Sequence, residues 1–176
     1  MQSFSDYLVE FGDRPYPWKI ITDTHDMLEA SFTPTLAAGE EPYFYVVTLW
    51  GVERSKVTPG IPGPPPVWTV WEFGFALIRP KQTTHSTVGA TLTSRGYQYG
   101  SSLVGTMTQA PAIISTVANI FLAFVQRRAP RAVVFSAKEP SRQRLYQRLV
   151  QRADQRLSNY RSVRGRAGEY RLERHF

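Results

Sequence analysis

Two long segments rich in β-branched and aromatic residues constrain the fold of this chain more than any other feature. They read PYFYVVTLWGV (42–52) and VWTVWEFGFALIRP (67–80), a composition typical of strands that pack against a core. The connection between them (53–66) holds five prolines and two glycines. Because proline removes ladder donors, we expect a mobile, extended loop there rather than a tight turn. A length of 176 residues is enough to bury such strands, and we expect a single domain over residues 1–176.

Weaker patterns surround these two strands. The segment THSTVGATLTS (84–94) alternates and predicts a third strand, whereas RGYQYGSS (95–102) is typical of a turn. The segment FGDRPYPW (11–18) is also turn-rich, while SFSDYLVE (3–10) and HDMLEASF (25–32) each fit either a short helix or a strand. We therefore expect the first half of the chain to be rich in β-structure.

The segment APAIISTVANIFLAFV (110–125) has apolar residues at helical spacing and predicts a long helix. Thr106 or Thr108 can cap its beginning, and we expect the helix to run to about Gln126, before Pro130. The segment carries polar residues and is shorter than the roughly 20 residues that a bilayer needs, so we expect a buried helix and no membrane span. Its predicted buried face consists of Ile113, Val117, Ile120, Phe121 and Phe124.

A strand, a second helix and a last strand complete the predicted order. RAVVFSA (131–137) is short and almost wholly apolar, as is typical of a strand inside a sheet. Ser141 can cap a second helix, and YRLERHF (170–176) alternates like a returning strand. This order predicts an α+β fold, in which two main C-terminal helices pack on a twisted, mostly antiparallel sheet.

The charge of the chain is unevenly distributed. Residues 1–125 hold seven Lys or Arg and ten Asp or Glu, whereas residues 126–176 hold fourteen and four, within a net charge of +7. A basic C-terminal part of this kind predicts nucleic acid or an acidic protein surface as the partner. A well-solvated basic surface is the alternative.

A Gln-Arg pair recurs every four residues in SRQRLYQRLVQRADQRLS (141–158). At 100° per residue, Arg144, Arg148 and Arg152 lie along one border of an apolar arc, about 6 Å apart along the helix axis. That rise is comparable to the separation of neighbouring phosphates on a nucleic-acid strand, and a guanidinium binds phosphate as a planar fork. A merely solubilising face is the alternative, since Arg and Gln are good helix formers. The predicted binding residues are Arg144, Arg148, Arg152, Arg156, Arg161, Arg164 and Arg166.

Arg142 falls inside the apolar arc, in the first turn of the same helix. An unpaired buried charge is costly, so this guanidinium requires a partner. Glu72 and Glu139 are the candidates for an internal ion pair that ties the helix to the sheet. The alternative is a bound anion beside Ser141, at the helix N-terminus.

The sequence contains no complete catalytic or metal-binding motif. The three histidines, His25, His85 and His175, are isolated, and the chain has no cysteine, so we expect no metal site. The run Asp23-Thr24-His25-Asp26 can serve acid–base chemistry, but a polar turn is the favoured interpretation. The nucleophile motif GxSxG and the phosphate loop GxxxxGK[ST] do not occur.

The segment VVFSAKEPSRQRLYQRL (133–149) resembles the region of GNAT acyltransferases in which a strand leads into a helix with a Leu-Tyr pair. The predicted order of strands, long helix, strand, helix and strand is also similar. The resemblance implies a GNAT-like topology, acetyl-CoA as the cofactor, Tyr146 as the general acid, and amides near Gly100–Gly105 that hold the pyrophosphate. The family's coenzyme loop, (Arg/Gln)xxGx(Gly/Ala), is not matched by RGYQYGSSLVGTMTQ (95–109). This favours a relative that uses no cofactor.

The stretch 115–149 is also similar to uncharacterised proteins of tailed bacteriophages. That resemblance implies a viral protein found in the host cytoplasm or in the virion, and the N-terminus shows no signal-peptide pattern. Our leading hypothesis is a small binding protein without catalysis of its own. The alternatives are a GNAT-type N-acyltransferase and a virion structural or assembly protein.

Overall fold

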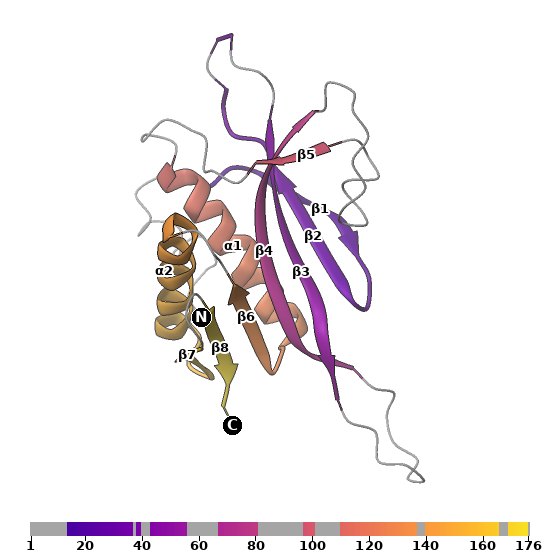
Figure 1. Ribbon diagram of the computed structural model, residues 1–176, viewed down its shortest axis with the longest axis vertical. Helices are drawn as coiled ribbons and strands as arrows, with labels where there is room; N and C mark the ends of the chain where they lie inside the picture. Colours follow the sequence, from indigo (N-terminus) through magenta and orange to yellow (C-terminus); the bar gives the residue numbers. More distant parts are fainter. Residues whose placement is uncertain are drawn as a thin grey trace. The chain divides into compact units, whose positions relative to one another are not determined.

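The computed structural model describes residues 14–36, 38–39, 43–55, 67–80, 97–100, 110–136, 140–165 and 169–175. It confirms the α+β prediction, because a mostly antiparallel sheet is combined with two helices (Figure 1). The strands follow the order β1-β2-β3-β4-β6-β8-β7 across the sheet, and β5 pairs with β4 outside this path. None of the described helices is long and apolar enough to cross a membrane.

The strongest sequence patterns all correspond to observed elements. The two long β segments and the apolar helix are present, and so are the later strand, the arginine-rich helix and the last strand. Their bounds are Phe44–Arg54 (β3), Trp68–Pro80 (β4), Ala110–Arg128 (α1), Ala132–Ser136 (β6), Pro140–Arg156 (α2) and Glu169–Arg174 (β8). The helix α1 ends where it was expected to end: Ala129 adopts a positive φ of 44°, and Pro130 follows it.

Several expectations require correction or lie outside the described residues. The segment expected to be a turn at 95–102 contains β5 (Tyr97–Gly100), and two further strands, β1 (Trp18–Asp23) and β7 (Tyr160–Arg164), were not predicted. The ambiguous segment 25–32 forms a turn and then β2 (Met27–Phe32). The predictions for 3–10 and 84–94, and for most of the loop 53–66, fall on residues that the structure does not describe.

The chain divides into two compact units. The first comprises Met1–Ile21, Ala30–Val47 and Phe75–Ile120, and the second comprises Thr22–Glu29, Thr48–Gly74 and Phe121–Phe176. Parts of the same strands and of the same helix belong to both units, and the single domain stays a prediction.

Stacked aromatic rings form the core of the first unit. The rings of Tyr16 and Phe32 stack with centroids 6.2 Å apart, those of Phe32 and Tyr45 at 5.2 Å, and those of Tyr45 and Phe75 at 5.2 Å. The buried Thr116 hydroxyl accepts a hydrogen bond from the Tyr16 backbone N–H at 2.8 Å. A helix residue therefore holds the chain that enters β1.

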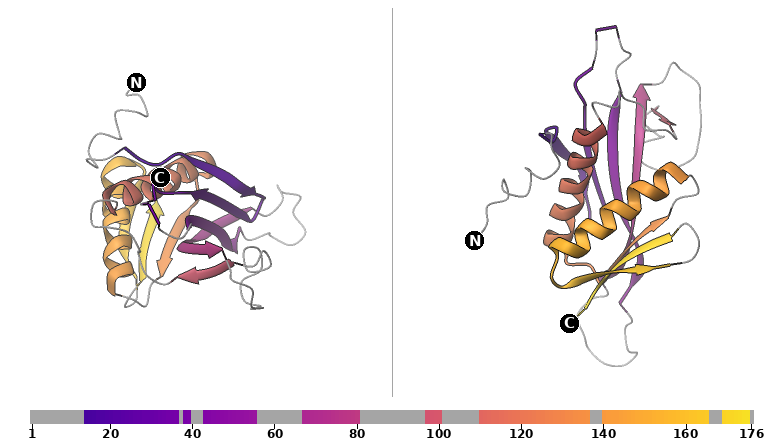
Figure 2. Two further views of the ribbon diagram at one scale, coloured as in Figure 1. Left: turned by 90° about the horizontal axis from the view of Figure 1, so that it is seen from above. Right: turned by 90° about the vertical axis from the view of Figure 1, so that its left-hand side faces the viewer.

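The second unit has its own aromatic core, in which the helices cover one face of the sheet. Phe73 of β4 contacts Phe121 of α1, Phe135 of β6 and Tyr146 of α2, with centroids 5.7, 5.0 and 5.5 Å apart. β6 pairs with β4 in parallel and with β8 antiparallel, and β8 pairs antiparallel with β7. The helix α2 packs on β7 and β8 (Figure 2). The polar side chains at one edge of α2 therefore lie next to these two strands.

Candidate functional site

The helix α2 is strongly basic and amphipathic. Its sequence contains five arginines and one acidic residue, Asp154. Five of the six residues of the predicted apolar arc are at most 5% exposed: Leu145, Tyr146, Leu149, Val150 and Ala153. The sixth, Leu157, follows the end of the helix and is half-buried. The exposed side chains among the described residues of the helix are all arginines and glutamines.

The exposed side chains of Arg144, Arg148 and Arg152 form the border that we call the arginine edge. Arg144 and Arg148 make no hydrogen bond or ion pair with any residue that the structure describes. Among the other predicted binding residues, Arg161 of β7 is exposed and Arg156 is half-buried. The side chains of Arg164 and Arg166 lie outside the described part.

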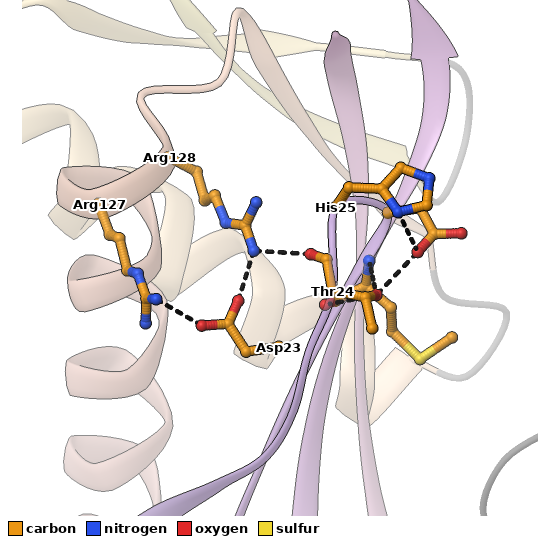
Figure 3. Close-up of polar contacts among 7 residues, drawn as sticks. Asp23, Thr24, His25, Arg127 and Arg128 are labelled. Carbon is orange, nitrogen blue, oxygen red and sulfur yellow. Dashed lines mark hydrogen bonds and ion pairs between the residues drawn. The ribbon is translucent and has the colours of Figure 1, made fainter.

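The arginines at the end of α1 differ from the arginine edge because they are paired. Figure 3 shows Asp23 between Arg127 and Arg128, with Arg127 Nη2 2.5 Å from Asp23 Oδ2. Arg128 pairs with the other carboxylate oxygen and donates a hydrogen bond to the Thr24 carbonyl at 2.7 Å. Its guanidinium also lies over the Trp71 ring, 5.7 Å from the centroid. These two arginines fasten the helix end to β1.

The residues after Asp23 form a polar turn (Figure 3). The Thr24 hydroxyl donates to Asp26 Oδ1 at 2.7 Å, and this hydrogen bond, with a smaller contribution from His25, holds the pKa of Asp26 below its ordinary value. The Met27 backbone N–H donates to the Thr24 hydroxyl at 3.1 Å. His25 is 76% exposed and lies 3.6 Å from Asp26. The hydrogen bonds close a turn, and the arrangement does not favour acid–base chemistry.

A groove of about 280 Å³ lies between α2 and the strands β7 and β8. Among the described residues, its walls carry two amides, a hydroxyl, a phenol and two valines, and none of these side chains is charged at neutral pH. The Ser162 hydroxyl, on the β7 wall, donates to Asp154 Oδ2 of α2 at 2.9 Å. The lining residues are Gln147, Val150 and Gln151 of α2, Ser162 and Val163 of β7, and Tyr170 of β8. Sequence reasoning missed the groove because it did not predict β7.

Tyr146, the residue that the acyltransferase resemblance identifies, lies in the core. It is 1% exposed and contacts Phe73 and Phe135, with ring centroids 5.5 and 5.7 Å away. Aromatic rings therefore occupy the space beside this phenol. Tyr146 does not line the groove. The tyrosine among the groove residues is Tyr170.

Glu72 is the predicted partner of Arg142, but the residues that affect its charge are Ser136 and Glu169. Burial and, to a smaller extent, the neighbouring Glu169 raise the pKa of Glu72, whereas a hydrogen bond with Ser136 partly opposes this rise. Since strand side chains alternate, Glu72 points away from the face on which Trp71 and Phe73 contact the helices. This placement does not favour an ion pair with α2. The side chains of Ser141 and Arg142, and the whole of Glu139, lie outside the described part, so neither alternative for them is tested.

Among the described residues, no group of three His, Asp or Glu is arranged to hold a metal ion.

Residues 107–175 match a family of unknown function, DUF6934. The matched region contains both helices, the arginine edge and the groove. No curated protein and no solved structure matches the chain. The acyltransferase and bacteriophage resemblances therefore stay predictions.

Proposed function

We propose that this protein binds nucleic acid through the arginine edge of α2. The observation that supports this most directly is the state of Arg144 and Arg148, which are exposed and unpaired among the described residues. Arg127 and Arg128 show that an arginine of this chain pairs with a carboxylate where one is provided. Arg144 and Arg148 are instead left open to an external anion.

The spacing and the neutral surroundings of the edge fit a chain of phosphates. Successive guanidinium groups are four residues apart, which is about 6 Å along the helix. A glutamine precedes each arginine of the edge, where Glu–Lys pairs commonly stabilise an exposed helix. No glutamate at these positions therefore offsets the charge of the edge, and each arginine can meet one phosphate.

The salt dependence of binding tests this proposal. We would measure the anisotropy of a fluorescein-labelled DNA duplex and of a labelled single strand, between about 50 and 200 mM salt. For each phosphate that the protein no longer neutralises, the slope of log K against log[salt] changes by about 0.9 on duplex DNA and by about 0.7 on a single strand. The triple variant R144Q/R148Q/R152Q is therefore expected to flatten the slope by about 2.7 on the duplex and about 2.1 on the single strand.

A charge-matched variant separates the position of the arginines from total charge. R14Q/K19Q/R131Q removes three exposed cations that lie outside α2, and it is expected to leave most of the slope intact. Equal reductions of the slope in the two triple variants would refute a dedicated edge. Binding to a labelled polyglutamate peptide, with none to either nucleic acid, would assign the edge to an acidic protein partner instead.

The GNAT-like topology and its acyltransferase activity form the second candidate. The element order favours it, since the strands β1 to β5 are followed by α1, β6, α2, β7 and β8, much as the resemblance implies. The burial of Tyr146 argues against it. Acetyl-CoA at a hundredfold excess over its Kd would stabilise the protein by about 2.7 kcal/mol, which a thermal melt detects. A melt that acetyl-CoA does not move would eliminate this candidate.

A further inference from the structure

We propose that the groove between α2 and the β7–β8 hairpin receives a single unstacked base of a single-stranded nucleic acid. The inference rests on the proposed function and specifies its ligand. The groove residues lie outside the arginine edge. Gln147 and Gln151 are on the other polar border of α2, and Tyr170 is on β8.

The chemistry of the groove selects a neutral planar group. The lining residues that the structure describes include no Lys, Arg, Asp or Glu, so none of them offers a phosphate a counter-charge. The amides of Gln147 and Gln151 each supply a donor and an acceptor, and a glutamine can contact a base edge with both. Tyr170 supplies an aromatic ring, and proteins that bind single strands stack bases on such rings.

The size of the groove limits the occupant to one small group. Its volume of about 280 Å³ lies just below the range of about 300 to 1,000 Å³ that ligand pockets span. A base in a duplex is stacked between its neighbours, so only an unpaired base can enter. The groove therefore distinguishes a single strand from a duplex, which the arginine edge alone does not do.

The arginine edge lies next to the groove along the helix surface. Arg144 precedes Gln147 by three residues, and Arg148 precedes Gln151 by three residues. Residues three apart on a helix are neighbours, with Cβ atoms about 5–6 Å apart. Each groove amide thus has an exposed guanidinium beside it, placed to hold the phosphate attached to a base in the groove.

The test measures the preference for single strands. Labelled oligo-dA, oligo-dC and oligo-dT, and a duplex of equal length, are titrated with wild type and with variants at constant salt. Base–aromatic stacking predicts that Tyr170→Leu weakens single-strand binding about 5- to 150-fold and leaves duplex binding unchanged. Tyr170→Phe keeps the ring and is expected to retain the affinity.

The glutamines give a second test that does not perturb the core. Gln147 and Gln151 are exposed, so Q147A/Q151A is expected to fold normally and to abolish the differences in affinity among the three oligonucleotides. Gln155→Ala is the matched control, since Gln155 is an exposed glutamine of the same helix that is not among the groove residues.

The outcomes separate the two proposals. Loss of single-strand preference in the Tyr170→Leu and Q147A/Q151A variants, with duplex binding intact, supports the base site. If Q147A/Q151A binds all four probes like wild type while R144Q/R148Q/R152Q binds none, the base site is refuted and the arginine edge stands. Wild type that binds no probe even at low salt refutes both.

Discussion

Asp23 carries the ion pairs that hold the end of α1 against β1, and its replacement by asparagine tests the energetic reasoning most directly. The substitution keeps the shape and one carbonyl acceptor but removes the charge that Arg127 and Arg128 share. Arg128 depends more on this charge, because its side chain is only 24% exposed, compared with 57% for Arg127. We therefore expect the Arg128 ion pair to account for most of the destabilisation.

The environment of each ion pair sets the size of the destabilisation. Hydrogen bonds to charged groups contribute about 1.5–3 kcal/mol, whereas an exposed ion pair contributes about 0–1 kcal/mol. The Asp23 side chain is 21% exposed, so solvent screens the Arg128 ion pair only in part. Arg128 also keeps its hydrogen bond to the Thr24 carbonyl. We expect Asp23→Asn to lower the free energy of unfolding by about 2 kcal/mol, which lowers the Tm of a chain of this size by about 4–8 °C.

Two double-mutant cycles in urea measure the two ion pairs separately. Tryptophan fluorescence follows unfolding, and Trp71 lies directly beneath the Arg128 guanidinium. The coupling of Asp23→Asn with Arg128→Gln should reach about 1.5 kcal/mol or more, and that with Arg127→Gln should stay below about 1 kcal/mol. Equal couplings, or a destabilisation of less than about 0.5 kcal/mol for Asp23→Asn, would refute the reasoning.

Two further substitutions test other features of the second unit. The pKa of Glu72 in the folded state is raised above its ordinary value of 4.5. The contribution of Glu72 to stability is therefore complete below pH 4.5, and it is lost as the pH rises through the folded-state pKa. Glu72→Gln should therefore gain stability relative to wild type as pH rises from about 4 towards 8, and parallel pH–stability curves would contradict this. Gly51→Ala would place a Cβ atom 2.3 Å from Cδ2 of the Trp68 indole. It should cost about 1–3 kcal/mol in the same urea assay, whereas an unchanged midpoint would show that the ring moves freely.

The elements that sequence reasoning predicted are those whose signal is local. The strands β3 and β4 are long and dense in apolar residues, and α1 and α2 each repeat an apolar face at helical spacing. The strand β7 reads YRSVR and carries no such pattern. It becomes a strand through its pairing with β8. The composition of neither segment indicates this pairing.

The same distinction applies to the candidate site. The arginine edge follows from 100° steps along one helix, so the sequence was enough to place it. The pairing of Asp23 with Arg128 joins residues 105 positions apart, and no local pattern in either segment predicts it. The groove needs α2, β7 and β8 together. It could not be predicted without the sheet order.

The alternation of glutamine with arginine is better explained by two adjacent ligand subsites than by solubility alone. Solubility favours Glu–Lys pairs, which also stabilise an exposed helix by about 0.2–0.5 kcal/mol each. A glutamate at position 147 or 151 would offer Arg144 or Arg148 an internal partner three residues away, and would place a negative charge on a groove wall. Glutamine at these two positions avoids both effects and retains a donor and an acceptor. On the proposed function, the repeat alternates a group for phosphate with a group for the attached base, and Gln151→Glu should weaken nucleic-acid binding more than Gln155→Glu does, although both remove one unit of net charge.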